Sequence, residues 1–212
     1  MYLFVRRGRL AGGQTRASMM WATEITERVN QVTGLGVSLH MQMFSAEVGE
    51  LVWATMVPDL ATLETGFEKL QVDDFFIAEQ DRAHGFMEGP PTDVLEQVVH
   101  GEPVDLGPGS YTFAGTAVCA PGRTADAVTA AIELADRAQA ITGAPALVAM
   151  GVTGTPGGIM WSSSYPGIES LEAGQQAMAD DPDWVALMDS KIAGLFVPDP
   201  TSAAQAIYRR LM

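Results

Sequence analysis

The chain has 212 residues, of which 47% are apolar and 18% are charged, and its formal net charge is −14. A chain of this length forms one or two domains with cores of their own. The acidic balance argues against a nucleic-acid surface, because phosphate binding needs clustered Lys and Arg. No apolar run approaches the roughly 20 residues that cross a bilayer. We therefore expect a globular protein that binds neither nucleic acid nor membrane.

The N-terminal residues MYLFVRRGRL place apolar residues before basic ones, the reverse of a secretory signal, so we expect the cytoplasm. Cys119 is the single cysteine, which excludes an internal disulfide and a cysteine-based zinc site. The three histidines, His40, His84 and His100, have none of the spacings that are typical of metal sites. We therefore expect no metal site and no bound cofactor.

A long internal repeat organises the chain. Thr15–Gly34 aligns with Thr124–Gly143, and the match continues on both sides. After a one-residue slip, six positions of the first half (Trp53, Pro58, Leu63, Glu64, Gly66, Gln97) meet identical residues 108 positions later (Trp161, Pro166, Leu171, Glu172, Gly174, Gln205). A repeat of this length is a folding unit that occurs twice. We predict one unit over residues 1–103 and a second over 109–212, joined by a linker within 101–110.

In the first unit, the hydrophobic pattern and the turn residues predict seven elements. A helix begins at a cap residue, Thr15 or Ser18, and Gly34 ends it as a left-handed C′ residue. The expected elements, in chain order, are a strand 2–10, a helix to about 32, strands 36–46 and 50–57 around a 47–49 turn, helices 60–70 and 75–86, and a strand 94–100.

The second unit repeats this order. Its expected elements are strand 111–119, helix 125–141, strands 146–153 and 158–165, helices 168–179 and 184–195, and strand 203–211. Paired acids precede the last helix of each unit, Asp73-Asp74 in the first and Asp180-Asp181 in the second. Because the pair recurs in both units, we interpret it as a helix cap rather than a catalytic pair.

The order β-α-β-β-α-β is that of the ferredoxin-like motif, in which two helices cover one face of a four-stranded sheet. The other face of each sheet needs a cover. The predicted fold is therefore α+β, with two tandem ferredoxin-like units whose sheets pack against each other as a barrel.

The segment AMADDPDWVALMDS (Ala177–Ser190) resembles the broken second helix of the dimeric α/β-barrel superfamily, and KLQVDDFFIAEQDR (Lys69–Arg82) is its counterpart in the first unit. The chain resembles monooxygenase-like and NIPSNAP-like members in the form of a tandem fused repeat. The resemblance implies a barrel with a ligand space. It leaves the activity open, because that superfamily includes cofactor-independent monooxygenases, haem-degrading and haem-binding enzymes, and isomerases.

His40 is the first candidate for catalysis. Leu39 and Met41 share one face of their strand, while His40 and Gln42 share the other. If the apolar face meets the helices, His40 lies between the two sheets, where an imidazole can act as a general base with Gln42 and Arg6 orienting the ligand. The alternative is a hydrogen-bonded core histidine or one at a solvated margin of the sheet.

Aromatic and hydroxyl side chains supply further candidates. Trp53 and Trp161 occupy equivalent strand positions, which favours packing within each unit, with an aromatic cavity floor as the alternative. Ser162 and Ser164 belong to a run of three serines that replaces the sequence Ala-Thr-Met of the first unit. We predict that Trp53, Trp161, Ser162 and Ser164 contribute to ligand binding if that strand faces a cavity.

His84 lies near the end of the second helical segment, where haem-degrading members of the superfamily carry an axial histidine. Ile192 stands at the equivalent place of the second unit. The alternative interpretation is an exposed histidine at the end of a helix.

The predicted function is binding of a small apolar or aromatic metabolite between the sheets, with a cofactor-independent monooxygenase or isomerase reaction if the protein is an enzyme. The alternatives are a non-catalytic structural or interaction module with a filled barrel, and haem binding. The sequence is compatible with a monomer or a homodimer, and it leaves catalysis itself open.

Overall fold

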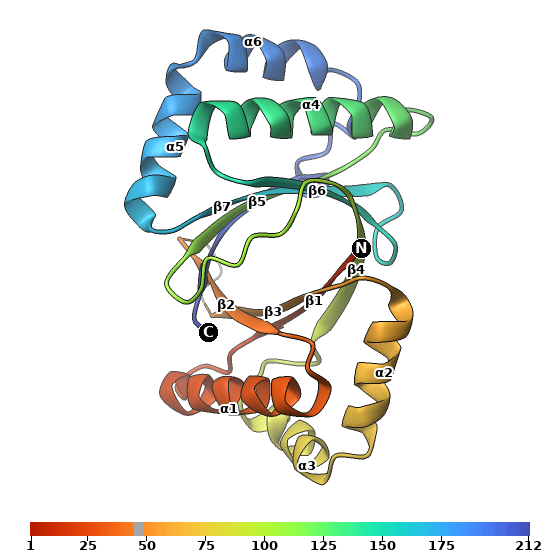
Figure 1. Cartoon of the computed structure of the whole chain (residues 1–212), viewed down its shortest axis with the longest axis vertical. Coiled ribbons are helices and arrows are strands. Elements are labelled where there is room, and N and C mark those ends of the chain that lie inside the picture. Colours follow the sequence, from red (N-terminus) through yellow and green to blue (C-terminus); the bar gives the residue numbers. More distant parts are fainter. Residues whose placement is uncertain (45–48) are drawn as a thin grey trace. The chain divides into compact units, whose positions relative to one another are not determined.

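In a computed structural model the chain divides into two compact units (Figure 1). The structure describes residues 1–44 and 49–212, so most of the predicted 47–49 turn and the end of the preceding strand lie outside the described residues. Unit 1 comprises Met1–Leu95 together with Arg210–Met212, and unit 2 comprises Glu96–Arg209. Each unit is α+β with antiparallel strand pairing.

Unit 1 has the predicted order of elements. Strand β3 pairs with β1 on one side and with β2 on the other, both antiparallel, and Arg6 lies opposite Trp53 in the β1–β3 register. Figure 1 shows α1 crossing one face of these strands, with α2 and α3 beside it. The bounds are β1 Tyr2–Arg9, α1 Thr15–Thr33, β2 Ser38–Met43, β3 Glu50–Val57, α2 Leu60–Gln71, α3 Asp74–Arg82 and β4 Thr92–His100.

Unit 2 repeats the order, and α4 crosses its sheet as α1 does in unit 1 (Figure 1). The strands are hydrogen-bonded in the order β8-β5-β7-β6-β4, and Gly115 lies opposite Trp161 in the β5–β7 register. The bounds are β5 Tyr111–Val118, α4 Thr124–Thr142, β6 Ala146–Gly151, β7 Gly158–Tyr165, α5 Ile168–Asp180, α6 Pro182–Lys191 and β8 Ala204–Arg210.

The unit boundary differs from the predicted division into 1–103 and 109–212. From Glu96 onward β4 pairs with β6, with Val98 opposite Ala149, so this half of the strand belongs to unit 2. At the other end of the chain, the Leu211 backbone N–H donates to the Leu39 carbonyl at 2.8 Å, which assigns the C-terminus to unit 1. Long-range strand pairing therefore overrides the linker composition of 101–110.

The ends of the long helices follow local sequence rules. Gly34 and Gly143, with φ of 73° and 70°, take the left-handed conformation and end α1 and α4 as predicted. The predicted cap at Thr15 or Ser18 is wrong. The N-cap of α1 is Gln14, which makes no side-chain capping bond, and Ser18 lies one turn inside the helix with its side chain buried.

The paired acids are helix caps, as predicted. Asp73 accepts from the Phe76 backbone N–H at 2.9 Å, and Asp181 accepts from that of Trp184 at 2.7 Å. Arg28 and Arg137, at equivalent positions of α1 and α4, form ion pairs with these two aspartates. The bond from Arg28 is the largest cause of the lowered pKa of Asp73, and the bond from the Phe76 N–H is the second largest. For Asp181 the order is reversed, with the Trp184 N–H lowering its pKa more than Arg137 does.

Each unit has a core between its helices and its sheet. In unit 1, Leu39 is fully buried and packs in one cluster with Trp21, Ala22 and Ile25 of α1, and Met41 packs against that cluster. This confirms that the apolar face of β2 meets the helix. The unit 2 core is built largely from the alanines of α4.

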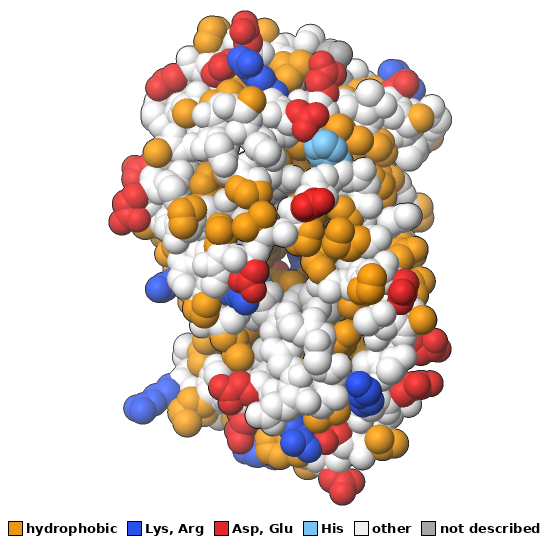
Figure 2. All heavy atoms as spheres, viewed as in Figure 1, with side chains coloured by type: hydrophobic (Ala, Val, Ile, Leu, Met, Phe, Trp, Pro, Cys, Tyr) orange, Lys and Arg blue, Asp and Glu red, His pale blue; other side chains and the backbone are white. Residues whose placement is uncertain are grey.

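On the face shown in Figure 2, Asp and Glu side chains are scattered among apolar ones rather than gathered in one place. Among the described residues, no helix has both the length and the apolar character to cross a membrane. The described part of the chain also contains no cluster of three or more His, Cys, Asp or Glu side chains suited to a metal ion.

Candidate functional site

Unit 1 contains a cavity of about 330 Å³ between its sheet and its helices. Strands β1 and β3 form the floor, and α1, α2 and α3 form the roof. Most lining side chains are aromatic or aliphatic, and the rings touch one another: Phe4 and Phe67 pack edge to face with centroids 5.4 Å apart, and Trp21 and Trp53 do so at 6.3 Å. The aromatic members of the lining are Phe4, Trp21, Trp53, Phe67 and Phe76.

Several polar atoms inside this cavity are paired within the protein, whereas the buried Nε1 of Trp21 has no hydrogen-bond partner among the described residues. Trp53 Nε1 donates to Thr26 Oγ1 at 2.8 Å, and that hydroxyl donates to the Ala22 carbonyl at 2.6 Å. Thr55 Oγ1 donates to the Leu35 carbonyl, also at 2.6 Å. A ligand in the inner part of the unit 1 cavity therefore meets a largely apolar surface.

Charged and ionisable groups occur at the edge of the unit 1 cavity. Arg6 lines it and binds Asp93 in a bidentate pair, with N–O distances of 2.7 and 2.8 Å. His84 also lines it and is exposed. The Asp81 carbonyl lies 2.7 Å from His84 Nδ1. Because a carbonyl only accepts, Nδ1 carries the proton, and Nε2 of the neutral ring keeps its lone pair.

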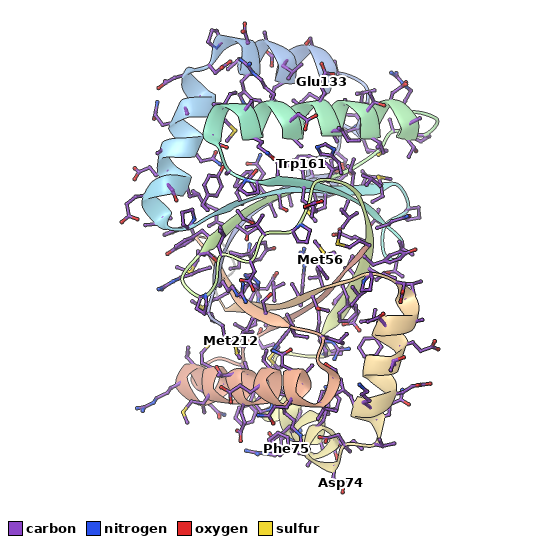
Figure 3. The ribbon with its side chains drawn as sticks, viewed as in Figure 1. Met56, Asp74, Phe75, Glu133, Trp161 and Met212 are labelled. Carbon is purple, nitrogen blue, oxygen red and sulfur yellow. The ribbon has the colours of Figure 1, made fainter. Side chains whose placement is uncertain are left out.

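Unit 2 contains a cavity of about 680 Å³ in the equivalent place. Strands β5 and β7 form its floor, and α4, α5 and α6 surround it. Figure 3 shows Trp161 on the face of this sheet that is turned toward α4. The aromatic side chains of the lining are Phe113, Trp161, Trp184 and Phe196.

No ionisable side chain lines the unit 2 cavity among the described residues. Its polar groups are hydroxyls and amides. Ser163 is bonded to the hydroxyl of Tyr165, and burial raises the pKa of that tyrosine. Gln175 Nε2 is buried and has no hydrogen-bond partner within the described part of the chain. This lining suits an uncharged ligand, because removing a charge from water without a partner costs several kcal/mol.

His40 lines neither cavity. Its Nε2 lies 2.8 Å from Ser38 Oγ, and that hydroxyl donates to the Ala54 carbonyl, so Nε2 carries the ring proton. Burial, followed by the positive charge of Arg210, lowers the pKa of His40 to about 4. The neighbourhood matches the alternative of a hydrogen-bonded, largely buried histidine, and the ring is neutral at pH 7.

The structure does not bring the predicted site residues together. Arg6 and Trp53 line the unit 1 cavity, whereas Trp161 and Ser162 line the unit 2 cavity. The remaining members of the predicted set, His40, Gln42 and Ser164, line neither. The helix-facing side of β3 and β7 carries the two tryptophans, so each packs in its own unit, as the first interpretation expected.

Sequence reasoning missed the cavity residues on the helices. Trp21 and Gln175 are examples, and both carry a signal in the repeat. Trp21 aligns with Ala130, and Gln175 aligns with Phe67, so the equivalent positions differ in size or polarity. The mismatches identify these residues once the helices are known to face a cavity.

No family model matches the sequence, and no curated protein is similar to it. Solved structures are similar over the whole chain. An anthrone oxidase-like protein, 12% identical, has a TM-score of 0.71 and covers 100% of this chain and 91% of its own. A monooxygenase-like protein from Fusobacterium nucleatum, 10% identical, has a TM-score of 0.69 with coverage of 100% and 92%.

The chain has the fold of the dimeric α/β-barrel proteins. This confirms the predicted resemblance, including its monooxygenase-like members. A NIPSNAP family protein from Agrobacterium tumefaciens, 14% identical, matches 44% of this chain and 89% of its own at a TM-score of 0.39. At 10–12% identity, the two matches over the whole chain establish the fold and no activity.

Proposed function

We propose that the protein binds a small, apolar, ring-containing metabolite between the sheet and the helices of a unit. The observation that carries this proposal is the pair of aromatic-lined cavities, about 330 and 680 Å³, at equivalent places. Ligand pockets commonly have such volumes and such linings. Protein interiors are otherwise close-packed, and an empty cavity costs stability. Space kept in both units therefore supports a binding role over a filled structural module.

Native mass spectrometry of the purified protein, with and without added naphthalene derivatives, tests this proposal. Val29 and Ala138 are equivalent residues that line the unit 1 and the unit 2 cavity. Val29→Trp fills the first cavity and Ala138→Trp fills the second, so each variant is the control for the other. We expect each adduct to be lost in one variant and kept in the other.

Circular dichroism establishes that both variants fold, and the smaller Val29→Phe and Ala138→Phe replace any that do not. If the folded wild-type protein retains no adduct, or if its adducts persist in both filled variants, the binding proposal is wrong.

His84 supports a second candidate, a cofactor-independent monooxygenation. Its unprotonated Nε2 makes no hydrogen bond within the described residues, and His84 lines the unit 1 cavity. Such a base can take a proton from a methylene group that flanking aromatic rings acidify. The resulting carbanion reduces O₂, a C–O bond forms, and loss of water leaves a ketone. The sum, CH₂ plus O₂ giving C=O plus H₂O, needs no further reductant.

Oxygen uptake with anthrone as the substrate tests this candidate. We expect one O₂ per product, and we expect His84→Gln to lower kcat by about 10²-fold or more, as the loss of a general base does. His100→Gln is the matched control, because His100 pairs with Asp136 and lines neither cavity. If uptake is the same in wild type and His84→Gln, His84 is not the base.

Haem binding would use the same Nε2 of His84 as its axial ligand. A Soret band that appears on adding hemin and disappears in His84→Ala would support this alternative. If no band appears, haem binding is excluded.

We also propose that the units are tandem ferredoxin-like repeats. The shared element order, the left-handed Gly34 and Gly143, and the equivalent caps Asp73 and Asp181 support this. The packing of one sheet on the other stays a prediction of the sequence.

A further inference from the structure

Trp161 and Trp53 are equivalent residues with different surroundings. Trp53 Nε1 is held by Thr26, but α4 has Ala135 at the position of Thr26, and Trp161 Nε1 makes no hydrogen bond within the described part of the chain. Trp161 thus carries an unpaired donor on the wall of the unit 2 cavity.

Gly115 explains how the indole of Trp161 is placed. A Cβ atom at position 115 would lie only 2.5 Å from Trp161 Cε2 and still closer to Nε1, so the ring rests directly on the backbone of β5. The equivalent residue of unit 1 is Arg6, which occupies this place with a side chain. The glycine therefore leaves room for the ring.

Gln175 supplies a second unpaired donor. It lines the unit 2 cavity, and its Nε2 is buried without a partner among the described residues. A buried N–H without an acceptor is unfavourable, because it has lost its hydrogen bond to water. A ligand oxygen in the cavity would supply the acceptor that this N–H lacks. Unit 1 has the apolar Phe67 at this position.

The volume of the unit 2 cavity and the lack of charge in its lining further define the ligand. Trp21, which fills part of the unit 1 cavity, is replaced in α4 by Ala130, which agrees with volumes of about 330 and 680 Å³. Since the unit 2 lining contains no ionisable side chain in the described residues, it offers no counter-charge to an ion.

We propose that the unit 2 cavity binds an uncharged, ring-containing molecule with a hydrogen-bond-accepting oxygen, such as a ketone or quinone carbonyl. Trp161 and Gln175 donate to its oxygens, and Gly115 provides the room for Trp161. This inference rests on the proposed binding function and names the ligand class of one of its two cavities.

The test uses prodan, an uncharged naphthyl ketone whose emission shifts to the blue when its carbonyl loses hydrogen bonds, and 2-dimethylaminonaphthalene, which lacks the carbonyl. We expect Gln175→Leu and Trp161→Phe each to weaken prodan binding about fivefold, the effect of one neutral hydrogen bond. Bound prodan should emit further to the blue in both variants. The carbonyl-free probe should bind wild type and Gln175→Leu equally.

Gln176→Leu is the matched control, because Gln176 is exposed on the same helix and bonds to Asp180. It should leave the affinity and the emission of prodan unchanged. Suppose that prodan binds to wild type and that Ala138→Trp abolishes this binding. If Gln175→Leu and Trp161→Phe then retain wild-type affinity and emission, this inference is overturned while the binding proposal stands. If neither probe binds to the folded protein, both fail.

Discussion

Unit 1 and unit 2 build a cavity in the same place from different residues. In unit 1, Trp21 narrows the space and Arg6 brings a charge to its edge, whereas unit 2 has Ala130 and Gly115 at those positions. In unit 1 the indole N–H of Trp53 is bonded to Thr26, whereas Nε1 of the equivalent Trp161 and Nε2 of Gln175 in unit 2 make no hydrogen bond within the described residues. The comparison shows that two units with the same order of elements and equivalent helix caps have different cavity linings.

The largest effect is expected from making unit 1 resemble unit 2 at position 21. Trp21 is 7% exposed and packs on Trp53 and Phe86. Trp21→Ala should lower the free energy of unfolding by about 3–5 kcal/mol, because it creates a void in a packed core. Urea denaturation measures this. Met20→Ala, at a neighbouring residue that is 64% exposed, is the control and should cost far less.

If Trp21→Ala is nearly neutral, α1 closes the space, and the cavity volumes of the two units do not depend on this residue. If the variant instead gains a binding site for prodan, the difference between the units is set chiefly by size.

A smaller effect is expected from pH at His40, whose equivalent in unit 2 is Ala149. The pKa of His40 is about 4 in the folded chain, against an ordinary value of 6.5. Between these two pH values the unfolded chain therefore binds a proton at His40 that the folded chain does not. Folding stability should therefore fall as the pH decreases from 6.5 to about 4. The loss is on the order of 2 kcal/mol, allowing for partial exposure.

Urea denaturation at several pH values should show a smaller slope in this window for His40→Ala than for wild type. Equal slopes would mean that His40 titrates alike in the folded and unfolded chains. The absolute stability of the variant does not matter for this comparison, since only its change with pH is used.

The smallest effect concerns the two caps. The pKa values of Asp73 and Asp181 are lowered, so their stabilising contribution is complete above the ordinary carboxyl pKa and is lost as the pH falls below it. Asn keeps the cap acceptor and loses the ion pair. Arg28 is the largest cause of the lowered pKa of Asp73, whereas the backbone N–H of Trp184 is the largest cause at Asp181. Asp73→Asn should therefore lower Tm more than Asp181→Asn.

The difference should be about 1–2 °C by differential scanning calorimetry near pH 7, because solvent screens both ion pairs. The alanine variants of both aspartates provide the reference, since they lose the cap and the ion pair together. An equal effect of the two asparagine variants would show that the caps are energetically alike.

Much of the fold could be predicted from local sequence. The hydrophobic pattern and turn residues predicted the order of elements. Gly34 and Gly143 end their helices, and Asp73 and Asp181 cap the following segments, because such signals depend on nearby residues. The helix start at Gln14 could not be predicted, since no side chain caps it. The unit boundary could not either, since the pairing of β4 with β6 joins residues about 50 positions apart.

The candidate site was less accessible from the sequence. His40 was placed on the correct face of β2, opposite Leu39. That face is turned away from the helices, and His40 lines neither cavity. Trp53 and Trp161 were recognised as a pair, yet their hydrogen bonding differs because of Thr26 and Ala135, which belong to helices far along the chain.

The sequence by itself determined the order of helices and strands, which is the same in both units, because periodicity, turn residues and caps are local properties of the chain. Only the tertiary structure decided where space is left, because a cavity depends on the volumes of side chains from several strands and helices together. It also decided which donors are paired. Gly115 is a plain strand glycine in the sequence, and it acquires a role only when the ring of Trp161 lies against it.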